Sequence, residues 1–147
     1  MILADDAATT RLGAAIGRVL GVGEAVCLSG PLGAGKSTLA RGLIRSLTTP
    51  DEEVPSPTFT LVQVYESPAL TIAHFDLYRL SNPDEIHELG LDEALDEGAA
   101  VIEWPERLEG RLPADRLDIE IAFDGDGRRV RMTPHGAWRG RGIGTLD

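Results

Sequence analysis

The sequence predicts an α/β fold, in which a mainly parallel β-sheet is flanked by helices and carries an antiparallel hairpin. A short apolar run at residues 25–28 favours a strand, and residues 38–47 have the apolar spacing of a helix. The continuous apolar run at 98–104 is typical of a buried parallel strand. Two β-prone runs, at 58–65 and 70–78, are joined by a short turn and predict the hairpin.

The loop between the first strand and its helix carries the strongest motif. Residues 30–37 read Gly-Pro-Leu-Gly-Ala-Gly-Lys-Ser, which matches the pattern G-x-x-x-x-G-K-[ST]. Glycines let backbone N–H groups surround a phosphate, and the helix N-terminus adds a partial positive charge. Lys36 would reach the β- and γ-phosphates, and the Ser37 hydroxyl would bind Mg²⁺. These residues predict a P-loop NTPase domain.

The remaining segments follow from simpler patterns. Residues 5–20 and 82–96 predict helices, and Gly90 weakens the middle of the second one. Alternating apolar residues at 117–123 and the run at 130–132 flank a turn containing Asp-Gly, which predicts a second hairpin. The glycine-rich end of the chain, residues 137–147, is expected to be a flexible tail.

Composition limits the classes of protein that the chain could be. Its 147 residues, 42% of them hydrophobic, fit a single domain over 1–147. We expect a cytoplasmic protein without a membrane segment, because no apolar run approaches the roughly 20 residues of a span and the N-terminus lacks signal-peptide features. Cys27 is the only cysteine and is expected in the core. The net charge of −10 argues against a broad electrostatic contact with nucleic acid.

Two acidic residues stand at the ends of apolar strands. Asp76 and Glu103 are candidates for hydrolysis chemistry, because the carboxyl ends of strands face the nucleotide in α/β sheets. Hydrolysis needs one carboxylate for the metal and a group that places the attacking water. His74 is expected to be a packing or surface histidine rather than a ligand. The P-loop alone would also permit a nucleotide or small-molecule kinase, or a nucleotide-gated binding module without useful turnover.

Several motifs together resemble one family. They are the P-loop, then Ser-Pro-Thr-Phe at 56–59, His-Phe-Asp-Leu-Tyr-Arg at 74–79, Glu-Leu-Gly-Leu-Asp at 88–92 and Glu-Trp-Pro-Glu at 103–106. In this order they resemble the bacterial TsaE (YjeE) family. The resemblance implies a small P-loop ATPase required for N6-threonylcarbamoyladenosine (t6A) at position 37 of tRNAs reading codons that begin with A. It also implies that TsaD and TsaB are partners in a complex, with tRNA involved indirectly.

The resemblance also assigns roles to individual residues, with ATP and Mg²⁺ as ligands. Lys36, Asp76 and Glu103 are implied in catalysis, and Ser37 and Glu103 as magnesium ligands. Ser56-Pro57-Thr58 resembles a switch-like loop, and Trp104 an aromatic residue beside the active site. The nucleotide-binding set combines the P-loop with less certain nucleoside-side contacts: Asp6, Thr9, Pro31, Leu32, Gly33, Ala34, Gly35, Lys36, Ser37, Thr38 and Arg128.

Pro31 is the clearest departure from the family pattern, because this position is usually Asp. Its side chain cannot form a hydrogen bond, and proline has no backbone N–H to donate. Any side-chain contact made at this position in relatives is therefore in doubt. Phosphate binding by residues 33–37 is not affected.

Overall fold

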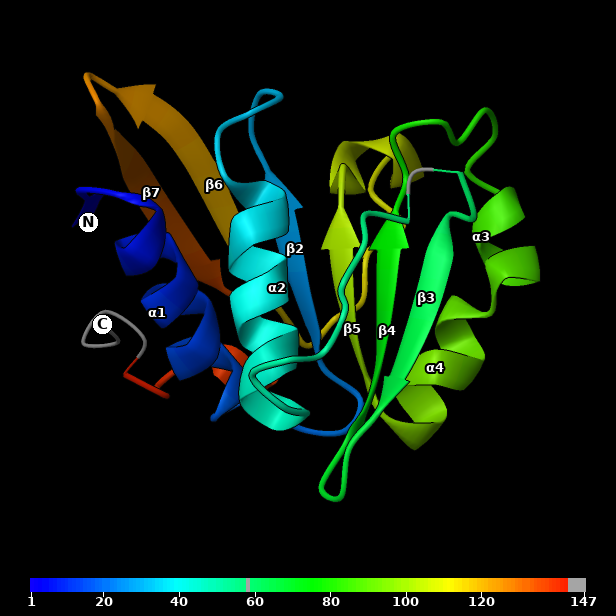
Figure 1. Ribbon diagram of the computed structural model, residues 1–147. Coiled ribbons are helices and arrows are strands. Elements are labelled where there is room, and N and C mark those ends of the chain that lie inside the picture. The colour runs from blue at the N-terminus through cyan, green and yellow to red at the C-terminus, as the bar shows by residue number, and fades with distance from the viewer. Residues whose placement is uncertain (58, 143–147) are drawn as a thin grey trace.

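The structure, a computed structural model, describes residues 1–57 and 59–142. Seven strands form one mixed sheet in the order β1-β7-β6-β2-β5-β4-β3 (Figure 1). The strands are β1 (Ile2–Leu3), β2 (Ala25–Ser29), β3 (Val62–Glu66), β4 (Thr71–Asp76), β5 (Ala99–Glu103), β6 (Arg116–Asp124) and β7 (Gly127–Pro134). The helices are α1 (Asp6–Gly17), α2 (Lys36–Leu47), α3 (Glu85–Leu89) and α4 (Leu91–Glu97), with 3-10 turns at Pro105–Leu108 and Gly136–Trp138.

The centre of the sheet is parallel and its edges are antiparallel. Strands β6, β2, β5 and β4 run in the same direction, whereas β3 pairs antiparallel with β4 and β7 with β6. This arrangement confirms the predicted fold class and both hairpins. The two-residue strand β1, which adds to β7, was not predicted because it is too short to show a periodic pattern.

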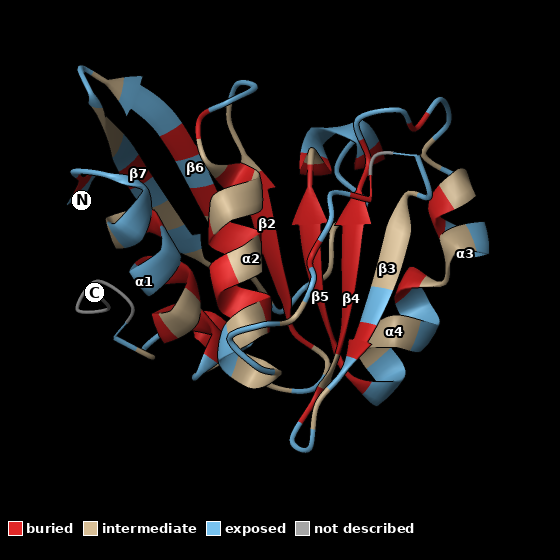
Figure 2. Ribbon diagram, viewed as in Figure 1, coloured by how far each residue is buried: buried red, intermediate tan, exposed pale blue. Residues whose placement is uncertain are grey.

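The helices divide between the two faces of the sheet. One apolar cluster joins α1 and α2 to the sheet, and a second joins α3 and α4 to its other face. Strands β2, β5 and β4 are buried between these layers (Figure 2). The parallel strands therefore lie in the core, and their carboxyl ends, where a nucleotide is expected, all point to one edge.

Glycines let α1 and α2 approach each other closely. A Cβ atom on Gly13 would lie 2.2 Å from the Leu39 carbonyl oxygen, and one on Gly42 would lie 2.5 Å from the Thr10 carbonyl oxygen. Both distances are shorter than any real Cβ contact. The position of α1 against the P-loop helix therefore depends on these two glycines, and α1 in turn reaches the region of the site.

Helix α1 is shorter than the predicted segment 5–20. Asp5 stands before the helix as its N-cap, and its carboxylate accepts a hydrogen bond of 2.9 Å from the Ala8 N–H. At the other end the Val19 N–H turns back to the Ile16 carbonyl at 3.1 Å, which begins a turn rather than another helical residue. Apolar residues at 19 and 20 continue the helical spacing without continuing the helix.

Two further predictions fail at positive backbone φ angles. The strand predicted at 58–65 begins only at Val62, because the Leu61 N–H bonds to the Pro57 carbonyl at 2.6 Å and Leu61 has a φ of 68°. The helix predicted at 82–96 is divided into α3 and α4, because Gly90 between them has a φ of 83°. Left-handed backbone interrupts both helices and strands.

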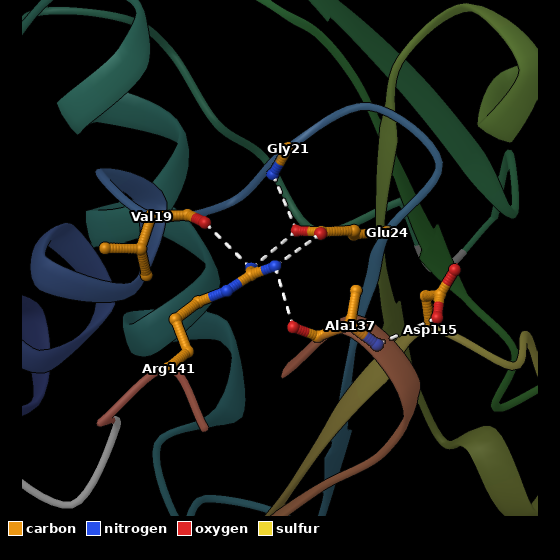
Figure 3. Close-up of polar contacts among 6 residues, drawn as sticks. All are labelled: Val19, Gly21, Glu24, Asp115, Ala137 and Arg141. Atoms are coloured by element: carbon orange, nitrogen blue, oxygen red, sulfur yellow. Dashed lines mark hydrogen bonds and ion pairs between the residues drawn. The ribbon is translucent and has the colours of Figure 1, made fainter. Parts of the chain in front are cut away.

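The expected flexible tail is wrong for residues 137–142. Trp138 is fully buried, and the Arg141 guanidinium bonds to both oxygens of Glu24 at 2.7 Å (Figure 3). Arg141 also donates to the carbonyls of Val19 and Ala137 at 3.0 Å each. A glycine-rich composition suggested fraying, but these contacts attach the segment to the body of the protein. Residues 143–147 lie outside the described residues.

Cys27 lies in the core, as predicted. It is 1% exposed in β2, and burial, reinforced by the negative charge of Asp118, raises the pKa of its thiol to about 12. The thiol is therefore protonated at neutral pH and acts as a small apolar side chain. Among the described residues, none of the helices has both the length and the apolar character needed to cross a membrane.

Candidate nucleotide-binding site

The P-loop connects β2 to α2 at the edge where the parallel strands end. Gly30, Gly33 and Gly35 have φ angles of 143°, 80° and 112°, which side chains other than glycine rarely adopt. Space is also limited, since a Cβ atom on Gly30 would lie 2.2 Å from the Ile121 carbonyl oxygen. The glycines therefore permit both the curvature of the loop and its close approach to β6.

Lys36 begins α2 and turns its ammonium group back toward the loop. Its Nζ atom donates to the carbonyl oxygen of Gly30 and, at 3.2 Å, to that of Pro31. Pro31 thus contributes through its carbonyl group, although it has no N–H. The indole of Trp104 covers the same ammonium, with 3.9 Å between Nζ and the ring centroid.

The environment of Lys36 combines burial with nearby negative charge. The residue is 5% exposed, and burial lowers the pKa of its ammonium group. The carboxylates of Glu103, Glu106 and Asp76 oppose that shift. A partly desolvated cation at the end of a glycine loop is well suited to attract a phosphate anion.

Asp76 and Glu103 stand side by side at the ends of β4 and β5, where they are register partners. The Asp76 carboxylate accepts hydrogen bonds of 3.1 Å from the Ser56 hydroxyl and from the Tyr78 N–H. Glu103 accepts a bond of 3.1 Å from the Ser37 hydroxyl. Both acids are at least 95% buried, and the structure places the two predicted carboxylates next to each other, with Glu103 bonded to the P-loop serine.

A cavity of about 420 Å³ lies over these groups. Most of the residues predicted to bind nucleotide line it. Its wall comprises Asp6, Leu32, Gly33, Gly35, Lys36, Ser37, Thr38, Ser56, Asp76, Tyr78, Glu103, Trp104 and Arg128.

Three predicted binding residues do not line this cavity: Thr9, Pro31 and Ala34. Thr9 is 1% exposed, and its hydroxyl donates to the Asp5 carbonyl. Its methyl carbon lies close to the loop, since a Cβ atom placed on Gly35 would be 3.6 Å from it. Thr9 therefore packs behind the loop. Thr58, the last residue of the predicted switch-like loop, lies outside the described residues.

Arg128 reaches the loop from β7. Its Nε atom donates to the Ala34 carbonyl at 2.9 Å, and its guanidinium lies 4.7 Å from the ring centroid of Phe123. With Asp6 it occupies the side of the cavity formed by β7 and α1. Arg128 and Asp6 are two of the residues for which the family resemblance implies nucleoside contacts.

Two residues near the site were not assigned a role from sequence. Tyr78 lines the cavity, and its ring lies 4.9 Å from that of Trp104. The Nε2 atom of His74 lies 2.6 Å from Oε2 of Glu103. The alternation of side chains along β4 could have indicated His74, because residues two apart on a strand share a face and Asp76 was already a candidate.

The oxygen atoms in the site fit a magnesium ion. Ser37 Oγ and Glu103 Oε1 are 3.1 Å apart beside Lys36, and both are hard oxygen donors. Mg²⁺ is usually held by one or two carboxylates together with phosphate oxygens and water. The site therefore combines a P-loop, the Lys36 ammonium group, two oxygen atoms that could hold a metal and a second carboxylate.

The chain is similar to known proteins over most of its length. The family model described as threonylcarbamoyl adenosine biosynthesis protein TsaE matches residues 3–131. A Rickettsia bellii protein named tRNA threonylcarbamoyladenosine biosynthesis protein TsaE is 37% identical over 129 residues, which cover 88% of this chain and 90% of that one. A Treponema pallidum protein of the same name is 40% identical over 122 residues, or 82% of this chain and 89% of its own.

The fold has a similar solved structure. The crystal structure of the Bacillus protein YdiB matches with a TM-score of 0.76 and 28% identity, over 92% of this chain and 84% of that one. The family match extends from β1 into β7, so it includes the P-loop, both strand-end carboxylates and Arg128. The chain therefore belongs to the TsaE family.

Proposed function

We propose that this protein is a magnesium-dependent ATPase that supports formation of t6A in tRNA together with TsaD and TsaB. The observation that carries the proposal is the pairing of Asp76 and Glu103 in adjacent strands, directly beside Lys36 and Ser37. A phosphate-binding loop alone explains nucleotide binding. A second buried carboxylate, held in place by its own hydrogen bonds, supports hydrolysis. The role in t6A formation is supported by the names of the relatives.

Each residue has a separate part in this mechanism. The N–H groups of the P-loop and the Lys36 ammonium bind the phosphates, and Ser37 and Glu103 hold Mg²⁺. When bound, Mg²⁺ would neutralise charge on the β- and γ-phosphate oxygens. Asp76 orients the water that attacks the γ-phosphorus, while the bond to the β-phosphate oxygen breaks and ADP leaves. The bonds from Ser56 and Tyr78 fix the direction of the Asp76 carboxylate for this task.

Measuring ADP release with and without the TsaD–TsaB complex tests the proposal. We expect slow hydrolysis by the protein alone and a clear rise when the complex is added. Free phosphate should appear in equal amount to ADP. If turnover ignored the complex but rose with a small acceptor that became phosphorylated, the protein would be a kinase and the proposal would be wrong.

A further inference from the structure

His74 is a buried polar residue that the mechanism above does not use. It lies in β4, two residues before Asp76, and so shares the face of the strand that carries Asp76. The residue is 1% exposed and does not line the cavity. Its Nε2 atom lies 2.6 Å from Oε2 of Glu103, the proposed magnesium ligand.

The direction of this hydrogen bond follows from the chemistry of the two groups. An ionised carboxylate can only accept, so Nε2 carries the hydrogen and donates it to Glu103. The other ring nitrogen, Nδ1, is buried and has no hydrogen-bond partner among the described residues. A hydrogen on Nδ1 would be a buried donor without an acceptor, which is costly. The contact therefore favours a ring that carries a hydrogen on Nε2.

The two oxygens of Glu103 therefore have different partners. Oε2 accepts from His74, and Oε1 faces the Ser37 hydroxyl at 3.1 Å. Without the bond to His74, the carboxylate could rotate about its terminal torsion and turn either oxygen away from Ser37. With that bond, Oε1 stays on the side where the metal is proposed to bind.

We propose that His74 is a positioning residue, which orients Glu103 so that Oε1 and the Ser37 hydroxyl bind Mg²⁺ together. This inference rests on the proposed function, because it concerns the magnesium site of the same nucleotide. His74 touches neither the nucleotide nor the metal and acts only through Glu103. Hydrogen bonds of this kind to metal ligands commonly change metal affinity by about 10- to 100-fold.

Three variants separate positioning from packing. His74→Leu keeps an apolar volume and removes the donor, whereas His74→Gln keeps an amide N–H at about the distance of Nε2 from the backbone. His87→Leu is the matched control, because His87 is exposed and lies on α3, away from the cavity. Its Nδ1 atom is 3.6 Å from Asp92 of α4. Binding of a fluorescent ADP analogue is measured in EDTA and then at increasing Mg²⁺.

We expect His74→Leu to bind the analogue in EDTA within about threefold of the wild type, but to need about 10- to 100-fold more Mg²⁺ for the magnesium-dependent gain in affinity. His74→Gln should recover most of this loss, and His87→Leu should behave as the wild type. An unchanged magnesium requirement in His74→Leu would overturn the inference and leave His74 as a packing residue. Failure of the Gln variant to recover would do the same.

A measurement on the wild type keeps the inference testable if His74→Leu does not fold. The chain has three histidines, so long-range ¹H–¹⁵N spectra can distinguish their rings. We expect the His74 ring to keep a hydrogen on Nε2, with a shift that changes when Mg²⁺ is added to the nucleotide-bound protein. A ring without a hydrogen on Nε2 would overturn the inference. If the wild type bound no nucleotide at all, the proposed function itself would fail, and the spectra would still report the hydrogen bond.

Discussion

Lys36 is the residue on which the proposed phosphate binding depends most directly. Its ammonium group is buried between two loop carbonyls and the Trp104 ring, so its charge is concentrated at the mouth of the P-loop. The protein as a whole carries a net charge of −10 and would otherwise repel an anionic nucleotide. A local cation is therefore needed to make the site attractive.

Replacing Lys36 by Ala should weaken ATP binding by about 10- to 100-fold, the loss expected for hydrogen bonds to a charged group. Titration with a fluorescent ATP analogue measures this change. Arg41→Ala is a matched control, since Arg41 lies on the same helix and outside the cavity wall. Equal losses in both variants would show that net charge, rather than the position of Lys36, determines binding.

Residue types at the site could be predicted where the signal is local in sequence. The P-loop motif is contiguous, and Asp76 and Glu103 end apolar runs. The contact of His74 with Glu103 joins positions 29 residues apart through the pairing of β4 with β5, and no local pattern contains that pairing. Thr9 lies on α1, but helix packing places it behind the loop, which the sequence pattern does not indicate.

At the scale of elements, the junction between β2 and the P-loop is the most constrained backbone in the site. Gly30 combines a φ of 143° with a carbonyl oxygen that a Cβ atom would meet at 2.2 Å. Gly110 offers a matched comparison, because its φ is 88° but nothing lies within 4 Å of a Cβ there. The two positions differ in available space and share an unfavourable conformation.

Gly30→Ala should destabilise the protein by about 3 kcal/mol or more, because backbone strain adds to a steric clash. Gly110→Ala should cost about 1 kcal/mol, from strain alone. Urea unfolding of both variants measures the difference. Similar values for the two would mean that β6 can move away from the loop and that the close approach is not required.

The elements themselves followed the sequence patterns, but their ends did not. The buried strand β5 and the helix α2 were found where apolar periodicity placed them. The late start of β3 depends on the turn from Pro57 to Leu61, and the division between α3 and α4 depends on Gly90. Both are decided by a single residue with positive φ. Gly90 is a recognisable weak point of the predicted helix, whereas Leu61 is not a residue type that favours this conformation.

At the scale of the whole molecule, residues 137–142 pack against the body of the protein at the end of β2 that lies opposite the site. Arg141 forms two hydrogen bonds with Glu24, just before β2 (Figure 3). Trp138, three residues earlier, is fully buried in the core. The first and last parts of the domain are thereby joined. This contact links positions 117 residues apart, and sequence composition suggested instead that the segment would be loose.

Arg141→Ala should lower the free energy of unfolding by about 2 kcal/mol near neutral pH, as charged hydrogen bonds of a partly buried pair are lost. Arg131→Ala is the control, because its pair with Glu120 is exposed and should contribute less than about 0.5 kcal/mol. Denaturant titration compares both with the wild type. An effect of Arg141→Ala no larger than the control would show that Trp138 alone attaches the segment.

The same ion pair should make stability depend on pH. The hydrogen bonds from Arg141 lower the pKa of Glu24 below its ordinary value of 4.5, against the opposing effect of burial. Since the folded pKa is the lower one, the pair stabilises the protein above pH 4.5 and loses this effect as pH falls through the folded value. The stability difference between the wild type and Arg141→Ala should therefore shrink as the pH falls below 4.5. A difference that stays constant to lower pH would contradict this explanation.

The site as a whole is assembled from the P-loop, the ends of β4 and β5, and the approach of β7 and α1. The proposed function depends above all on hydrolysis of ATP that requires Asp76. Phosphate release from ATP and Mg²⁺ by the wild type and Asp76→Asn tests it most directly, with nucleotide affinity measured for both. We predict nearly equal affinity and a loss of turnover of about 100-fold or more in Asp76→Asn. Equal turnover in the two proteins would contradict the role of this carboxylate and the mechanism built on it.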